Sequence, residues 1–136
     1  MGLKTISKLK KELDKWFSLY IRLRDCDDNG MVICFTSGRK YHYKNIHAGH
    51  FISRKQLATR WSILNVQPQS AADNLFGQGE QYQFGINLDS KYGKGTAEQL
   101  SLEARQTIKM SRVDYEEKIT YYKSVVNKIK QEKNIE

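Results

Sequence analysis

Three residues in the middle of the chain have side chains that suit the hydrolysis of a phosphodiester. His50 ends the segment Ala48-Gly49-His50, Asn65 follows fifteen residues later, and Asn74 nine residues after that. A histidine at a strand end can take a proton from an attacking water. A hard cation such as Mg²⁺ accepts a neutral amide oxygen, so we expect Asn74 to be a metal ligand. Asn65 would organise the histidine loop, because a carboxamide both donates and accepts hydrogen bonds.

The charge around these residues favours a polyanionic partner. The chain has a net charge of +8, and residues 31–72 contain neither Asp nor Glu. Such a field attracts nucleic acid through counterion release, although a solvated surface is the alternative. Arg54 is expected beside the scissile phosphate, since a guanidinium matches phosphate geometry. The predicted nucleic-acid contacts are Arg39, Lys40, Lys44, Arg54, Lys55 and Arg60.

The hydrophobic pattern predicts a single α+β domain, residues 1–136, that positions these side chains. Apolar residues at helical spacing predict an N-terminal helix over 1–24. A β-hairpin (31–35 and 41–43) and a ββα unit would fill residues 31–92, with strands at 46–52 and 65–69 and helical segments at 73–76 and 81–92.

A further helix is predicted at the C-terminal end of the chain. Thr96, followed three residues later by Gln99, indicates a capping box that starts one long helix over 96–132. Its apolar stripe would pack on the N-terminal helix or on a partner subunit.

The sequence predicts neither a membrane segment nor a disulfide framework. No apolar run approaches the ~20 residues of a membrane span, so we expect a cytoplasmic protein without a membrane partner. The two cysteines, Cys26 and Cys34, form no Cys-x-x-Cys pair and are expected to be free thiols.

Five segments together with Asn74 carry a resemblance to a known family; they are residues 20–25, 34–38, 48–54, 65–69 and 92–100. They resemble the phage NinG/Rap recombination endonucleases, which belong to the HNH (ββα-metal) nuclease superfamily, over roughly residues 16–100. The resemblance implies a metal-dependent, structure-selective DNA endonuclease. Its substrates would be branched recombination intermediates such as Holliday junctions and D-loops, in the host cytoplasm if the chain is phage-encoded.

The zinc positions of that family are degenerate in this chain. Where the family has four zinc cysteines, this sequence reads Cys34, Ser37, Ser70 and Asp73. Serine is a very poor zinc ligand, so a structural zinc is not expected. Packing between the N-terminal and C-terminal helices would supply the stability that zinc gives to small metallo-domains.

A second departure from the family lies three residues before His50. The family has an acid there, whereas this chain has His47. A neutral imidazole beside Asn74 would weaken a Mg²⁺ site and favour Mn²⁺. The alternative is that His47 only packs or contacts phosphate.

The expected activity is one-metal hydrolysis, with His50 as general base and a divalent ion held by Asn74 and His47. Two other interpretations stay open. In the first, the chain is a non-catalytic branched-DNA-binding protein with a degenerate HNH scaffold. In the second, it is a helical adaptor that binds protein through its C-terminal helix. Paired incision across a junction would need a homodimer.

Overall fold

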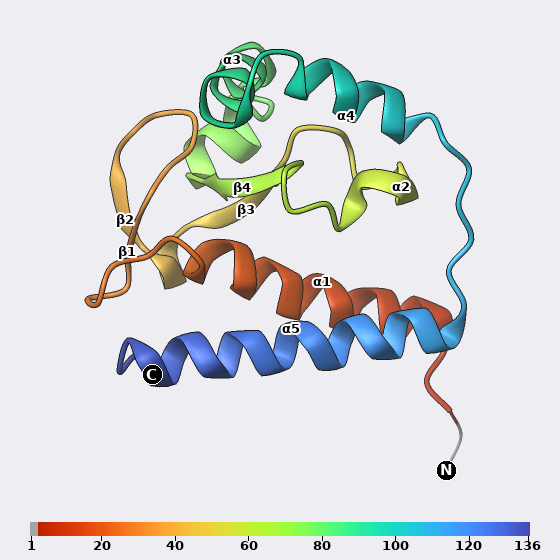
Figure 1. The fold of residues 1–136 in the computed structure, drawn as a ribbon. Coiled ribbons are helices and arrows are strands. Elements are labelled where there is room, and N and C mark those ends of the chain that lie inside the picture. Colours follow the sequence, from red (N-terminus) through yellow and green to blue (C-terminus); the bar gives the residue numbers. More distant parts are fainter. Residues whose placement is uncertain (1–2) are drawn as a thin grey trace.

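The computed structural model describes residues 3–136, which form an α+β fold with two small antiparallel sheets (Figure 1). The predicted α+β class is therefore confirmed. Residues 1 and 2 of the predicted helix 1–24 lie outside the described residues. The elements are α1 (Ile6–Leu23), β1 (Met31–Ile33), β2 (Lys40–His42), η1 (Tyr43–Asn45), β3 (His47–His50), α2 (Leu57–Arg60), β4 (Val66–Gln69), η2 (Ala72–Phe76), α3 (Gln81–Tyr92), α4 (Thr96–Ala104) and α5 (Arg112–Glu132).

Helices α1 and α5 lie side by side and run in the same direction, and α1 separates α5 from the β3–β4 sheet (Figure 1). The apolar stripe of α1 repeats every three or four residues, so it forms one face of the helix. That face is buried against α5, with Phe17 and Tyr122 in an edge-on contact at 5.0 Å between ring centroids. The predicted packing of the N-terminal helix on the C-terminal helix is confirmed.

Two short strand pairs carry the middle of the chain. Strand β1 pairs antiparallel with β2, and β3 pairs antiparallel with β4, where His50 lies opposite Val66. The two sheets are joined by a backbone hydrogen bond from Phe35 N–H to the Pro68 carbonyl at 2.7 Å. The strands predicted at 31–35, 41–43, 46–52 and 65–69 all form, although each is shorter or shifted by a residue or two.

The single long helix predicted over 96–132 is wrong, because the chain leaves the helical conformation between Ala104 and Arg112. Helix α4 packs on α3, whereas α5 packs on α1, so the two helices bury their apolar faces in different parts of the molecule. The linker 105–111 joins α4 to α5 along one side of the fold (Figure 1).

The capping box also lies elsewhere than predicted. The Thr96 hydroxyl donates to the Gly93 carbonyl instead of capping α4. A true capping box starts α5, where Ser111 Oγ accepts from Asp114 N–H at 3.1 Å and Asp114 Oδ2 accepts from Ser111 N–H at 2.8 Å. This reciprocal pair satisfies two backbone donors at the helix start and favours a new helix there.

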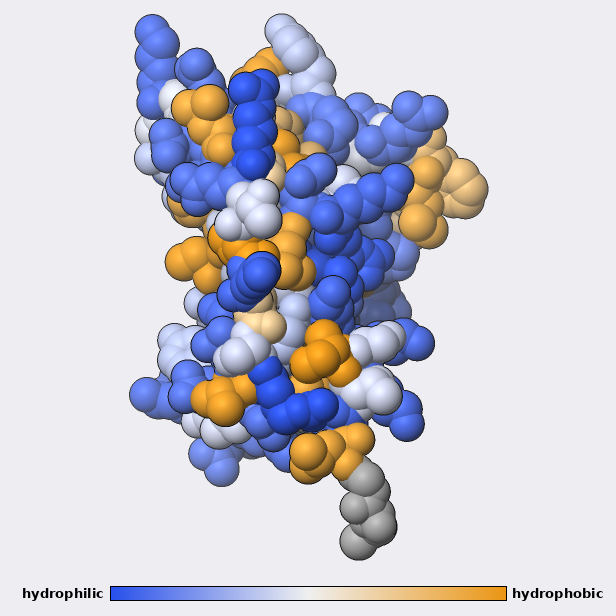
Figure 2. Space-filling view, turned by 90° about the vertical axis from the view of Figure 1, so that its right-hand side faces the viewer, coloured by the Kyte–Doolittle hydropathy of each residue, from blue (hydrophilic) through white to orange (hydrophobic). Residues whose placement is uncertain are grey.

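The face that carries the linker 105–111 is mixed in character. Figure 2 shows small separate groups of hydrophobic residues among hydrophilic ones on this side of the molecule. Within residues 3–136, no helix combines the length and the hydropathy that crossing a membrane requires.

Candidate functional site

A pocket of about 390 Å³ lies between α1 and β3, and we call it the His50 pocket. It brings together five of the ten predicted site residues: Lys44, His47, His50, Arg54 and Asn74. The rest of its lining consists mainly of residues from α1; it comprises Asp14, Phe17, Ser18, Arg22, Ile46 and Ala48. The other predicted residues do not line this pocket; they are Arg39, Lys40, Lys55, Arg60 and Asn65.

His50 is held by a backbone group of the following loop. Its Nε2 lies 2.9 Å from the Arg60 carbonyl oxygen. Because a carbonyl only accepts hydrogen bonds, Nε2 carries the proton and the lone pair of the neutral ring is on Nδ1. Burial lowers the pKa of His50, and the bond to the Arg60 carbonyl opposes this only in part. The neutral ring is therefore favoured, with Nδ1 able to accept a proton.

Asn65 is completely buried and joins the two ends of the loop after His50. Its Oδ1 accepts from Ile52 N–H at 2.7 Å, and its Nδ2 donates to the carbonyls of Ile52 and Thr59, both at 3.0 Å. These are the contacts that an organiser of the histidine loop would make. Asn65 thereby holds the Thr59 carbonyl, one residue before the Arg60 carbonyl that contacts His50.

His47 and Asn74 come from different elements and touch inside the pocket. The structure places Asn74 Nδ2 3.1 Å from His47 Nδ1, with Asn74 on the wide helical turn η2 directly after β4. The amide donates and the imidazole accepts when His47 carries its proton on Nε2. Within residues 3–136, no group of three or more His, Cys, Asp or Glu side chains is arranged to hold a metal ion.

Asp14 lines the His50 pocket and was not indicated by the sequence. Its carboxylate accepts from the Arg60 guanidinium at 2.6 and 3.2 Å and from Trp61 Nε1 at 2.9 Å. Since the Arg60 carbonyl holds His50, Asp14 fixes the segment that orients the histidine. The available signal was an acid one position after Leu13 and three before Phe17, next to the apolar stripe of a helix whose only other acid is Glu12.

The predicted cationic side chains differ in their exposure and in their contacts. Lys44 and Arg54 are exposed at the pocket, whereas the Arg60 side chain is only 19% exposed and its guanidinium donates to Asp14. Arg22, another residue that the sequence did not indicate, lines the pocket and donates to the Tyr43 carbonyl at 2.8 Å. The remaining predicted cations, Lys55, Arg39 and Lys40, are exposed outside it.

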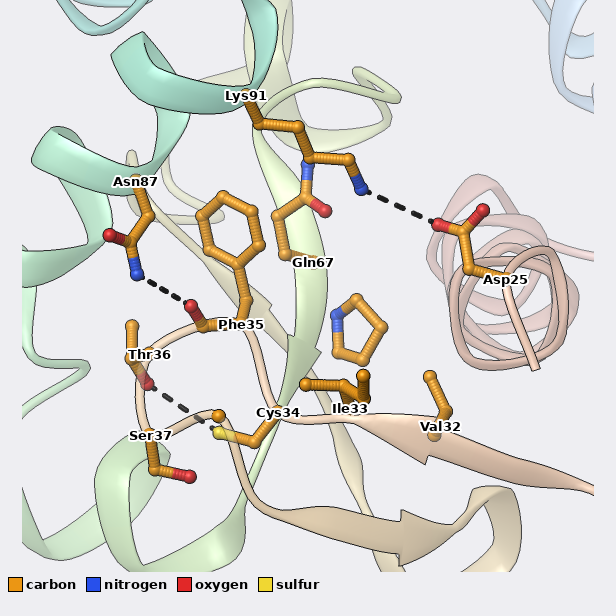
Figure 3. A pocket seen from close by; sticks show the side chains of 12 residues that line it. Asp25, Val32, Ile33, Cys34, Phe35, Thr36, Ser37, Gln67, Asn87 and Lys91 are labelled. Carbon is orange, nitrogen blue, oxygen red and sulfur yellow. Dashed lines mark hydrogen bonds and ion pairs between the residues drawn. The ribbon is translucent and has the colours of Figure 1, made fainter. Parts of the chain in front are cut away.

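A second polar group, which we call the Cys34 cluster, contains the degenerate zinc positions. Ser70 N–H donates to Cys34 Sγ at 3.2 Å, and Asp73 Oδ2 accepts from Thr36 Oγ1 at 2.7 Å while lying 4.0 Å from the sulfur. Asp73 N–H in turn donates to Ser70 Oγ at 3.2 Å. Figure 3 shows Cys34 directed toward Thr36, with Ser37 beside it, at one end of a pocket of about 520 Å³.

Burial alone would raise the pKa of Cys34. Hydrogen bonds from Ser37, from the Ser70 N–H and from Thr36 outweigh it and lower the pKa of this thiol to about 7. The cluster therefore links the loop after β1 to the segment after β4 through hydrogen bonds around the Cys34 sulfur.

The fold and the His50 pocket together define a small α+β protein with a basic, histidine-containing cavity. The model of the family described as Bacteriophage Lambda NinG protein matches residues 1–133. The chain belongs to this family, which confirms the NinG part of the resemblance, over more of the sequence than residues 16–100. No curated protein and no solved structure matches the chain.

Proposed function

We propose that this protein is a metal-dependent, structure-selective DNA endonuclease of the HNH type. Its substrates would be branched recombination intermediates such as Holliday junctions and D-loops in the host cytoplasm. One observation carries the proposal: a histidine of fixed tautomer, His50, shares a pocket with the touching pair His47 and Asn74 and with exposed cations. A general base, two metal donors and phosphate-binding groups are what phosphodiester hydrolysis needs.

In this proposal His50 takes a proton from the attacking water. Its Nε2–H stays on the Arg60 carbonyl, so the proton moves to Nδ1 and the resulting cation is stabilised by the same carbonyl. The lowered pKa of His50 means that the base form is present at neutral pH. Asn65 acts indirectly, because it holds the loop that carries this carbonyl.

Asn74 and His47 would hold a divalent cation, Mg²⁺ or Mn²⁺. In the structure the lone pair of His47 Nδ1 accepts from Asn74 Nδ2, so holding an ion would require this hydrogen bond to open. One amide oxygen and one imidazole nitrogen would then leave several positions for water and phosphate oxygens. The nitrogen donor favours Mn²⁺. When bound, such an ion neutralises charge on the phosphate and stabilises the leaving 3′ oxygen.

Lys44 and Arg54 would bind the DNA backbone at the pocket. Both are exposed, and their charge is not neutralised by an acid within residues 31–72. Arg39, Lys40 and Lys55 would extend this contact along the DNA away from the site, as phosphate contacts that carry no sequence information.

The test is a cleavage assay on a labelled four-way junction and a matched linear duplex, with Mg²⁺, Mn²⁺ or EDTA. The parent is expected to cut the junction only with metal, and His50→Ala to lose about 10²–10⁴-fold in rate. His42→Gln is the matched control, because His42 lies outside the pocket and glutamine keeps an acceptor for Lys44 N–H. Equal rates for the parent and His50→Ala would contradict the assignment.

One observation favours a second candidate function. The touching pair His47 and Asn74 supplies neutral donors only, so its hold on a metal ion would be weak. A protein that shifts a junction in a gel but cuts it with no metal would be a non-catalytic branched-DNA-binding protein. A homodimer is part of the nuclease proposal if cuts are paired, and light scattering at micromolar concentration would detect it.

A further inference from the structure

Two large apolar side chains directly after Asn74 project into solvent. Leu75 is 60% exposed and Phe76 is 86% exposed, on the last two positions of η2. An isolated exposed apolar residue needs no explanation, whereas adjacent ones beside a candidate site point to a contact surface. We call these two residues the η2 tip.

The backbone around the η2 tip is held in place. Gln78 and Glu80 have φ values of 55° and 46°, on either side of Gly79 at 81°. Such left-handed conformations are unfavourable for residues other than glycine and persist only where the surroundings enforce them. Here the buried Gln69 side chain donates to the Gly79 carbonyl at 2.8 Å, and Gly79 N–H donates to the Asp73 carbonyl at 2.8 Å. The turn that presents Phe76 is therefore anchored to β4.

The η2 tip is close to the place where a phosphate would bind. Phe76 is two residues after Asn74, which lines the His50 pocket, so their Cα atoms are at most about 7 Å apart. That distance is on the scale of one nucleotide step in a single strand. Residues two apart on a helical turn point to different sides of it, and Phe76 does not line the pocket, so the phenyl ring projects outside the pocket. The ring would therefore meet the base of a nucleotide next to the one whose phosphate is at Asn74, outside the pocket.

We propose that the η2 tip stacks on an unpaired or unstacked nucleobase at the branch point of the DNA substrate. This inference rests on the proposed function, and it assigns the preference for branched over linear DNA to Phe76. In a continuous duplex the base faces are covered by their neighbours, whereas at a branch point they can open onto an aromatic ring. Apolar side chains inserted between bases are used in this way by many DNA-bending proteins.

The charge of the protein favours DNA over a second copy of the chain as the occupant. The pocket beside the η2 tip has the cations Lys44, Arg54 and Arg22, and the chain has a net charge of +8. Two copies meeting at this tip would bring like charges together, whereas DNA neutralises them. Glu80 is exposed on the same turn, so the tip is suited to base stacking and leaves phosphate binding to the pocket.

The test measures binding in EDTA, so that it does not depend on cleavage. Parent, Phe76→Ala and Phe76→Trp are titrated into a four-way junction with 2-aminopurine next to the branch point and into a matched duplex. Phe76→Ala is expected to bind the junction about tenfold more weakly, to leave duplex binding unchanged, and to lose the fluorescence change of the unstacked base. Phe76→Trp should retain both.

Tyr121→Ala is the matched control. Tyr121 is 59% exposed on α5, which α1 separates from the β3–β4 sheet, so its removal should leave junction binding unchanged (Figure 1). The inference is overturned if Phe76→Ala binds the junction as tightly as the parent or weakens junction and duplex equally. It is also overturned if Phe76→Ala converts a dimer into a monomer in light scattering, because the tip would then contact a second copy. A parent that binds neither DNA would overturn the proposed function as well.

Discussion

The Cys34 cluster and the His50 pocket both lie where strands end, and they use their polar groups differently. Around Cys34 the thiol, hydroxyl and carboxylate groups bond to one another and to backbone groups, so the polar side chains are satisfied within the protein. Around His50 the internal bonds go only to one side of the ring, while Lys44 and Arg54 stay exposed. Satisfied polar groups give rigidity, and groups left open to solvent are available to a ligand.

The largest expected effect comes from Asp14, which lines the His50 pocket but is itself hydrogen-bonded within the protein. Asp14→Asn keeps an oxygen for Trp61 Nε1 but removes the charge that holds Arg60. The Arg60 carbonyl would then be less well placed, and cleavage should fall about tenfold to a hundredfold, since small misplacements are costly in catalysis. Nitrogen NMR of His50 would show loss of the single Nε2–H tautomer.

Glu12→Gln is the control on the same helix, because Glu12 makes an exposed ion pair with Lys4. It should change neither cleavage nor the His50 tautomer. If Asp14→Asn slows cleavage while the tautomer is unchanged, Asp14 does not act by positioning His50.

A smaller effect is expected on stability from the Cys34 cluster. Asp73→Ala removes the acceptor of the 2.7 Å bond from Thr36 and should lower the free energy of unfolding by about 1.5–3 kcal/mol. Urea unfolding followed by circular dichroism measures this change. Glu132→Ala removes a long, exposed ion pair with Lys128 and should change the free energy of unfolding by less than about 0.5 kcal/mol. Equal losses for the two variants would argue against a stabilising role for the cluster.

The smallest effect concerns titration of the two thiols. Cys34 should ionise with a pKa near 7, whereas burial raises the pKa of Cys26 above its ordinary value. Because the folded pKa of Cys34 is below its ordinary value of 9.0, its contribution to stability should grow as pH rises from about 7 to about 9. Ultraviolet absorbance of the thiolate in the parent and in Cys34→Ser checks the assignment. A parent without a thiol titrating near pH 7 would contradict it.

The local sequence pattern was sufficient to predict those elements of the fold that depend on short-range spacing and residue type. The amphipathic stripe of α1, the strand pairs and the turn residues between them follow from spacing and residue type. That His50 and Asn74 line the same pocket was expected from the family resemblance. The α4–α5 break was missed because the linker 105–111 contains neither glycine nor proline. Only the Ser111 and Asp114 capping pair marked it.

The α1 wall of the pocket could not be predicted for a different reason. Asp14 and Arg22 reach the site from a helix far away in sequence, and their partners are known only once α1 is placed under β3. The same holds for Arg60, whose nearest acid is on that helix.

The packing of α1 between the pocket and α5 has a consequence for the order of events during synthesis. One side of α1 supplies Asp14, Ser18 and Arg22 to the pocket, and its apolar side is covered by α5, which follows every other described element in the chain. A nascent chain that has made all the pocket residues still lacks the support for one wall of the pocket. Contacts between segments so distant in sequence form late in folding. A chain truncated before α5 would therefore be expected to lack a properly formed His50 pocket.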